Sequence, residues 1–154
     1  MEAAGVSSPI ITNALLKGLN TAFVASESDS GWLNGILFSL ENMTFETASK
    51  APASNRPTII AHVHHVRLCL ETVRAWARDE QPQPDWGSSW HRTSSMTQSE
   101  WNDLKAGLHK EFELTKELIQ TQASWDERSL SSAIDNIAHC AYHASAIRQI
   151  MKLV

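Results

Sequence analysis

Hydrophobic residues recur at intervals of three and four along most of this 154-residue chain. This spacing marks one face of an α-helix, whereas a half-buried strand requires strict alternation of apolar and polar residues. No alternating segment of convincing length occurs in the sequence. The pattern therefore predicts an all-α protein. The length suits a single domain, residues 1–154, with a core large enough to fold without crosslinks.

Four long segments carry the helical pattern, and polar stretches containing proline or glycine separate them. Thr58 is a suitable N-cap for the second segment, and Thr97 and Glu100 form a capping box at the start of the third. Four helices that each have an apolar face predict a four-helix bundle. The expected helices cover about residues 8–25, 58–78, 98–121 and 129–153, with a short amphipathic helix within residues 32–40.

Two connections between these helices are long. Residues 43–57 contain two prolines and are expected to form a connection without a helix, and residues 79–96 form a polar loop that includes Trp86 and Trp90. Loops of this length are uncommon in compact domains and often serve as lids or binding segments. We favour the simpler interpretation, in which the two tryptophans pin the loop onto the helices.

The composition excludes several classes of function. A net charge of −4 with 19% charged residues provides no basic surface for nucleic acid or for an anionic membrane. No apolar run is long enough to span a bilayer and no signal peptide is visible, so a cytoplasmic location is the default expectation. Cys69 and Cys140 form no C-x-x-C pair, which argues against a zinc ribbon and a thioredoxin-like redox site.

A pair of histidines in the last predicted helix, His139 and His143, suggests a metal site. Residues four apart project from the same side of a helix, and His143 falls on the apolar face with His139 at its edge. Burying two imidazoles costs solvation, and a shared cation would compensate for that cost. The alternative is two core histidines that hydrogen-bond to the backbone or to Asp135 and Asn136, and the pattern fits both equally.

The second predicted helix would supply a third nitrogen ligand. His64 is expected to point away from the apolar face, whereas His62 lies within that face and His65 lies at its edge. The periodicity slightly favours His62 as the more buried residue but does not decide which of the two meets the metal. Three histidines would leave a position open for water or substrate on a divalent ion.

The remaining sequence offers few other chemical groups. His91 in the polar loop is a possible distal ligand but is more simply an exposed residue, and His109 is expected on a solvated helix face. The chain contains no H-E-x-x-H, Glu-x-x-His or G-x-S-x-G motif. The metal would therefore be the main electrophile, and the catalytic residues are unknown because no general base stands out.

Three segments resemble the DinB/YfiT-like superfamily of metal-binding four-helix bundles. They are residues 58–66, residues 85–90 with Glu100-Trp101, and residues 138–149 with their H-x-x-x-H pair. In the family, a Ser/Thr-Ile start leads seven residues later to a metal-binding histidine. That register selects His65, with His62 as an additional histidine. One departure is Ala144-Ser145, where many members have a glycine.

The resemblance implies one divalent ion, typically zinc or nickel, bound by His65, His139, His143 and water. It also implies a homodimer, and some relatives are enzymes that use a low-molecular-weight thiol whose pKa the metal lowers. We therefore expect a metal-dependent enzyme that transfers such a thiol to a small electrophile. The alternatives are a non-catalytic metal-binding or interaction bundle of the stress-associated type, and a bundle whose histidines bind no metal.

Overall fold

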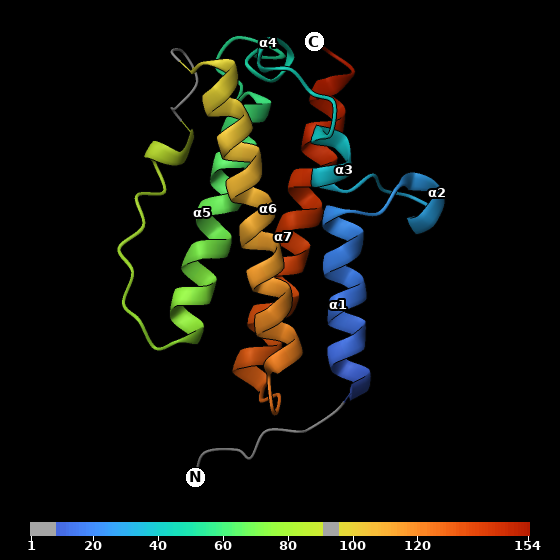
Figure 1. Cartoon of the computed structure of the whole chain (residues 1–154), viewed down its shortest axis with the longest axis vertical. Helices are drawn as coiled ribbons and strands as arrows, with labels where there is room; N and C mark the ends of the chain where they lie inside the picture. The colour runs from blue at the N-terminus through green and yellow to red at the C-terminus, as the bar shows by residue number, and fades with distance from the viewer. Residues whose placement is uncertain (1–8, 91–95) are drawn as a thin grey trace.

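The computed structural model describes residues 9–90 and 96–154, which form helices and no strand. Four long helices run side by side along the length of the molecule (Figure 1). The all-α prediction is therefore confirmed. The long helices are α1 (Pro9–Phe23), α5 (Ile59–Ala77), α6 (Gln98–Thr121) and α7 (Glu127–Met151), and the short ones are α2 (Glu27–Ser30), α3 (Ile36–Leu40), α4 (Phe45–Ala48) and the 3-10 helix η1 (Ser88–Trp90).

The direction of the helices explains the long connection between α5 and α6. In Figure 1, α1 and α7 run upward, whereas α5 and α6 both run downward and pack against each other. The chain must therefore return along the whole of α5, which has 19 residues and is about 28 Å long at about 1.5 Å per residue. The returning segment places η1 against α5.

Aromatic side chains fill the core between the helices. The rings of Phe23 and Phe112 stack with centroids 4.9 Å apart, and Trp101 is fully buried. The indole N–H of Trp101 donates to the carbonyl oxygen of Met43 at 2.9 Å, so this large side chain keeps its one polar group satisfied. The apolar faces of the long helices are mostly buried, but Ala77, which the helical spacing places on the apolar face at the end of α5, is exposed.

Side-chain caps define where the long helices begin. The Thr58 hydroxyl accepts a hydrogen bond from the backbone N–H of Ala61, and the predicted capping box of Thr97 and Glu100 is present. Helix α7 begins at Glu127, two residues earlier than predicted. The reason is a capping box in which Asp126 accepts from the Ser129 N–H at 2.7 Å and Ser129 Oγ accepts from the Asp126 N–H at 3.0 Å.

Two short helices lie where the sequence predicted only connections. Helix α2 lies between the first two expected helices, in residues 26–31, and α4 lies within residues 43–57. A four-residue helix makes only about one turn, so it shows no hydrophobic period. Gly35, just before α3, lies where the backbone passes close to the end of α1. A Cβ at this position would lie 2.3 Å from the carbonyl carbon of Phe23, which explains the glycine.

None of the described helices combines the length and the apolar character needed to cross a membrane.

Candidate metal centre

Helices α5 and α7 pack against each other and bring together five side chains of types that can bind metal. Helix α7 contributes His139 and His143, four residues apart. Helix α5 contributes His65 and Cys69, also four residues apart, and His62 one turn earlier. Each i, i+4 pair projects from one side of its helix, so the two pairs face each other across the contact.

The ligand atoms of His65, Cys69 and His139 all lie within 4.8 Å of one another, so this group could hold a metal ion. The Cys69 Sγ is 3.6 Å from His65 Nε2 and 4.0 Å from His139 Nε2. The predicted ligand His143 is not one of these three residues, but its Nε2 lies 3.0 Å from that of His139. Around zinc, with bonds of about 2.0–2.1 Å to nitrogen and about 2.3 Å to sulfur, tetrahedral geometry separates N and S ligands by about 3.6 Å and two N ligands by about 3.4 Å.

The hydroxyl of Ser89 determines the tautomer of His65. Ser89 Oγ donates its single hydrogen to the carbonyl oxygen of Trp86 at 2.7 Å and lies 2.9 Å from His65 Nδ1. Because that hydrogen is already used, Nδ1 of His65 must be the donor in the second contact. Neutral His65 therefore carries its proton on Nδ1 and presents the Nε2 lone pair toward Cys69 and His139.

His62 lies behind His143. The two Nδ1 atoms are 2.8 Å apart, so one ring donates to the other. If His143 donates from Nδ1, its Nε2 lone pair is directed toward His139, and His62 acts as the acceptor that orients it. The structure thus places His62 against the back of His143 and His65 beside Cys69, a distinction that the sequence left open.

Trp90 of η1 covers the histidines from the loop side. Its ring stacks on His65 with centroids 4.2 Å apart and lies edge-on to His62 at 5.4 Å. Trp86 also lies near His65, at 6.0 Å. The expectation that these tryptophans pin the loop onto the helices agrees with these contacts, and the residues that they contact are the candidate ligands.

Burial keeps these side chains uncharged. It lowers the pKa of His62 and of His65 to about 4, with the neighbouring histidines adding to the effect at His65. The pKa values of His139 and His143 are also lowered, chiefly by burial. Burial raises the pKa of the Cys69 thiol to about 12. Without a cation the group consists of four neutral imidazoles and a thiol, and neutral imidazole is the form that binds metal.

The other histidines are not part of this group. His109 is exposed on α6, as predicted, whereas His64 is half-buried and not the surface residue that was expected. His91 lies outside the described residues.

The absence of a C-x-x-C motif gives no indication of Cys69 as a candidate ligand. The signal that could have found it is His65-x-x-x-Cys69, which repeats the spacing of His139-x-x-x-His143. Ser89 and Trp90 have no comparable signal, because their position depends on the path of the loop.

A comparison of the chain with models of protein families, with curated proteins and with solved structures finds no match. The resemblance to the DinB/YfiT-like bundles therefore rests only on the segments quoted above.

Proposed function

We propose that this protein binds one divalent metal ion between α5 and α7, with His65, Cys69, His139 and His143 as ligands. The observation that carries the proposal is the clustering of three ligand atoms, from His65, Cys69 and His139, within 4.8 Å. Two further features support it: the short Nε2–Nε2 distance of 3.0 Å between His139 and His143, and the Ser89 contact that orients the His65 lone pair toward Cys69.

The ligand set favours zinc. Three imidazoles and a thiolate are the borderline and soft donors that zinc takes in tetrahedral sites. Binding would displace the Cys69 proton, because a coordinating thiol is deprotonated by the adjacent cation. Nickel, the other ion that the family resemblance implies, also accepts imidazole ligands, but the thiolate shifts the preference toward zinc.

The first experiment is metal analysis of protein purified without added metal or chelator, followed by substitution with cobalt(II). We expect about one ion per chain and a near-ultraviolet sulfur-to-cobalt charge-transfer band. Cys69→Ala should abolish that band, whereas the control Cys140→Ala should retain it, since Cys140 is buried beside Asn136. A protein that takes up no divalent ion after incubation would contradict the proposal.

A second candidate function is the metal-dependent thiol enzyme, built on a four-helix bundle of DinB-like type. It uses His65, His139 and His143 as the only protein ligands. The Cys69 Sγ marks the position that the external thiol would take, because it lies 3.6 Å and 4.0 Å from two of these ligand nitrogens. That is where a low-molecular-weight thiol would coordinate if Cys69 were displaced.

The two candidates respond differently to added thiol. If Cys69 is a permanent ligand, glutathione leaves the cobalt spectrum of the wild-type protein unchanged and restores a charge-transfer band only in Cys69→Ala. A thiol-induced change in the wild type instead supports the enzyme, because it shows an exchangeable coordination position.

A further inference from the structure

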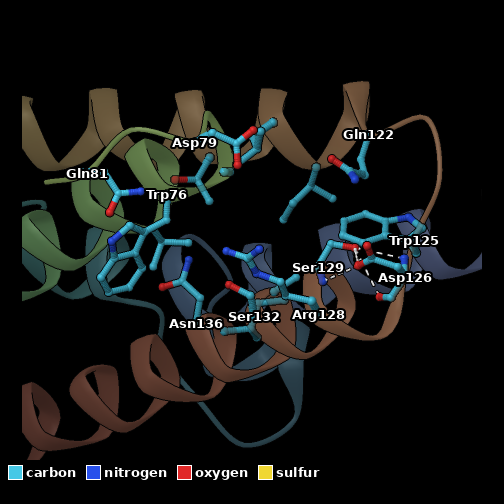
Figure 2. Close-up of a pocket in the computed structure, with 17 residues that line it drawn as sticks. Trp76, Asp79, Gln81, Gln122, Trp125, Asp126, Arg128, Ser129, Ser132 and Asn136 are labelled. Atoms are coloured by element: carbon cyan, nitrogen blue, oxygen red, sulfur yellow. Dashed lines mark hydrogen bonds between the residues drawn. The ribbon is translucent and has the colours of Figure 1, made fainter. Parts of the chain in front are cut away.

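A cleft opens between the C-terminal half of α5, α6 and the first turns of α7, with a volume of about 510 Å³ (Figure 2). It is separate from the metal group, because none of the five metal-ligating side chains lines it. It begins close by, however. Val73 lies one turn beyond Cys69 on α5, and Asn136 lies about one turn before His139 on α7.

Two exposed side chains of opposite charge line the cleft without forming an ion pair with any described residue. Arg128 of α7 and Asp79, just after α5, both line the cleft. Among the described residues, neither side chain forms a hydrogen bond or an ion pair. Asp126 also lines the cleft, but its carboxylate accepts hydrogen bonds from the hydroxyl and the backbone N–H of Ser129. These bonds lower the pKa of Asp126, and the charge of Arg128 helps to lower it. Figure 2 shows Asp79 and Arg128 on opposite walls, with the cleft between them.

Asn136 adds a buried polar group to the same wall as Arg128. Only 8% of Asn136 is exposed, and its Oδ1 accepts a weak hydrogen bond from the Cys140 thiol. Its amide nitrogen has no hydrogen bond among the described residues and points into the cleft beside the Arg128 guanidinium (Figure 2). The nitrogen is not sealed from solvent, so it is available to donate a hydrogen bond to an acceptor on a ligand.

The ends of the cleft are aromatic. Trp76 and Trp125 lie at its two ends in Figure 2, and Val73, Leu118 and Ile119 supply apolar surface between them. Small-molecule sites in proteins combine such apolar walls with a few polar groups that fix orientation. A ligand that fits this cleft has a flat apolar body and carries a negative and a positive group.

We propose that the cleft binds a small zwitterion with an aromatic body, of the chemical class of the free aromatic amino acids. The carboxylate lies against the Arg128 guanidinium and the Asn136 amide, which together offer several donors to its two oxygens. The ammonium group lies against the Asp79 carboxylate, and the aromatic ring lies between the tryptophans. Because no metal takes part, the proposal does not depend on the metal site.

Calorimetric titration of metal-free protein at low ionic strength tests this proposal with three probes. L-phenylalanine carries both charges, 3-phenylpropionate carries only the carboxylate, and 2-phenylethylamine carries only the ammonium group. We expect L-phenylalanine to bind most tightly. Each charged contact should contribute on the order of tenfold in affinity, as expected for hydrogen bonds to charged groups.

Two variants assign the contacts. Arg128→Gln should weaken L-phenylalanine and 3-phenylpropionate on the order of tenfold and leave 2-phenylethylamine unchanged. Asp79→Asn should show the reverse pattern. Asp79 has a φ of 58°, and asparagine tolerates this left-handed conformation, so the variant alters the charge and not the backbone. The controls Arg56→Gln and Asp103→Asn make the same charge changes at exposed sites outside the cleft and should bind as the wild type does.

Three results would overturn the proposal. They are no binding of any probe at millimolar concentration, equal weakening of all three probes by Arg128→Gln, or no effect of Asp79→Asn on L-phenylalanine. Each of these results is obtained without metal, so it leaves the proposed metal function untouched. Loss of metal binding in Cys69→Ala would in turn leave the cleft unaffected.

Discussion

Ser89 influences the candidate metal centre although it is not a ligand. Its hydroxyl donates to the Trp86 carbonyl and accepts from His65 Nδ1, so it holds the His65 lone pair on the side of Cys69 and His139. Outer-shell partners of this kind are worth 10–100-fold in metal affinity. The tautomer of one histidine is thus determined by a serine 24 residues away in sequence.

We expect Ser89→Ala to weaken zinc binding by about 10–100-fold while the helical fold is retained. The serine lies in η1 and not in a long helix, so its loss removes an orienting contact and little of the core. Competition with a chromophoric chelator measures the affinity, and far-ultraviolet circular dichroism measures the fold. Ser88→Ala is the matched control and should bind zinc normally, because the Ser88 hydroxyl donates to the Asp85 carbonyl oxygen and, among the described residues, to no histidine.

His143→Ala should abolish tight metal binding and leave the protein folded. His143 is buried, but the apolar residues of α5, α6 and α7 bury far more surface and carry most of the stability. His62→Ala should have a smaller effect on affinity, because it removes only the group that orients His143. Metal analysis with circular dichroism separates these outcomes. Unfolding of His143→Ala upon loss of the metal would mean that the metal is structural.

At the scale of elements, the arrangement depends on two helices that run in opposite directions. Helix α5 presents His65 before Cys69, and α7 presents His139 before His143, so the antiparallel packing brings one turn of each helix face to face (Figure 1). The cleft continues along the same contact, since Val73 and Asn136 belong to the next turns. One packed pair of helices therefore carries both candidate sites.

The start of α6 provides a test of the capping box read from the sequence. Thr97 Oγ1 accepts from the Glu100 N–H at 3.2 Å, and the Glu100 carboxylate accepts from the Thr97 N–H at 2.6 Å. We expect Thr97→Ala to lower the free energy of unfolding by about 0.5–2 kcal/mol, measured by urea denaturation. Ser99→Ala lies in the same exposed turn and is the control. Equal effects of the two changes would show that the cap contributes nothing.

The positions of the long helices could be predicted from sequence because each helix buries one face over several turns. The boundaries were less predictable. Helix α7 begins earlier than predicted because its capping box has the acidic residue, Asp126, at the N-cap and the serine, Ser129, at N3. This reverses the common order of the two residue types. The short helices α2 and α4 could not be predicted because they are too short to show a hydrophobic period.

For the molecule as a whole, the sequence predicted helices but not their directions. Helices α5 and α6 run parallel, whereas a short loop between them would require them to be antiparallel. Hydrophobic periodicity is the same in both cases, so it does not distinguish them. The long segment between them was the one indication. Its return past α5 is what brings Ser89 and Trp90 onto His65, so these contacts could not be predicted from local pattern. The DinB-like type of four-helix bundle and the homodimer both remain predictions.

The buried histidines also determine how the stability of the whole metal-free protein depends on pH. In the unfolded chain these imidazoles gain a proton near pH 6.5, whereas burial holds the pKa of His62 and His65 at about 4 in the folded state. A group with a lowered histidine pKa binds fewer protons when folded. Above about pH 6.5 the imidazole is neutral in both states, so it does not change the free energy of unfolding. As the pH decreases from about 6.5 toward 4, only the unfolded state gains the proton, and the free energy of unfolding falls.

We therefore expect the urea midpoint of metal-free protein to be constant above about pH 7 and to fall steadily between about pH 6.5 and 4.5. The carboxylates of Asp126 and Glu100 do not explain this fall, because their pKa values are lowered and they titrate below that range. His62→Gln should flatten the slope, since glutamine does not titrate, whereas His109→Gln should not, because His109 is exposed on α6. A slope that is the same in all three proteins would mean that the buried histidines do not stay neutral in the folded state.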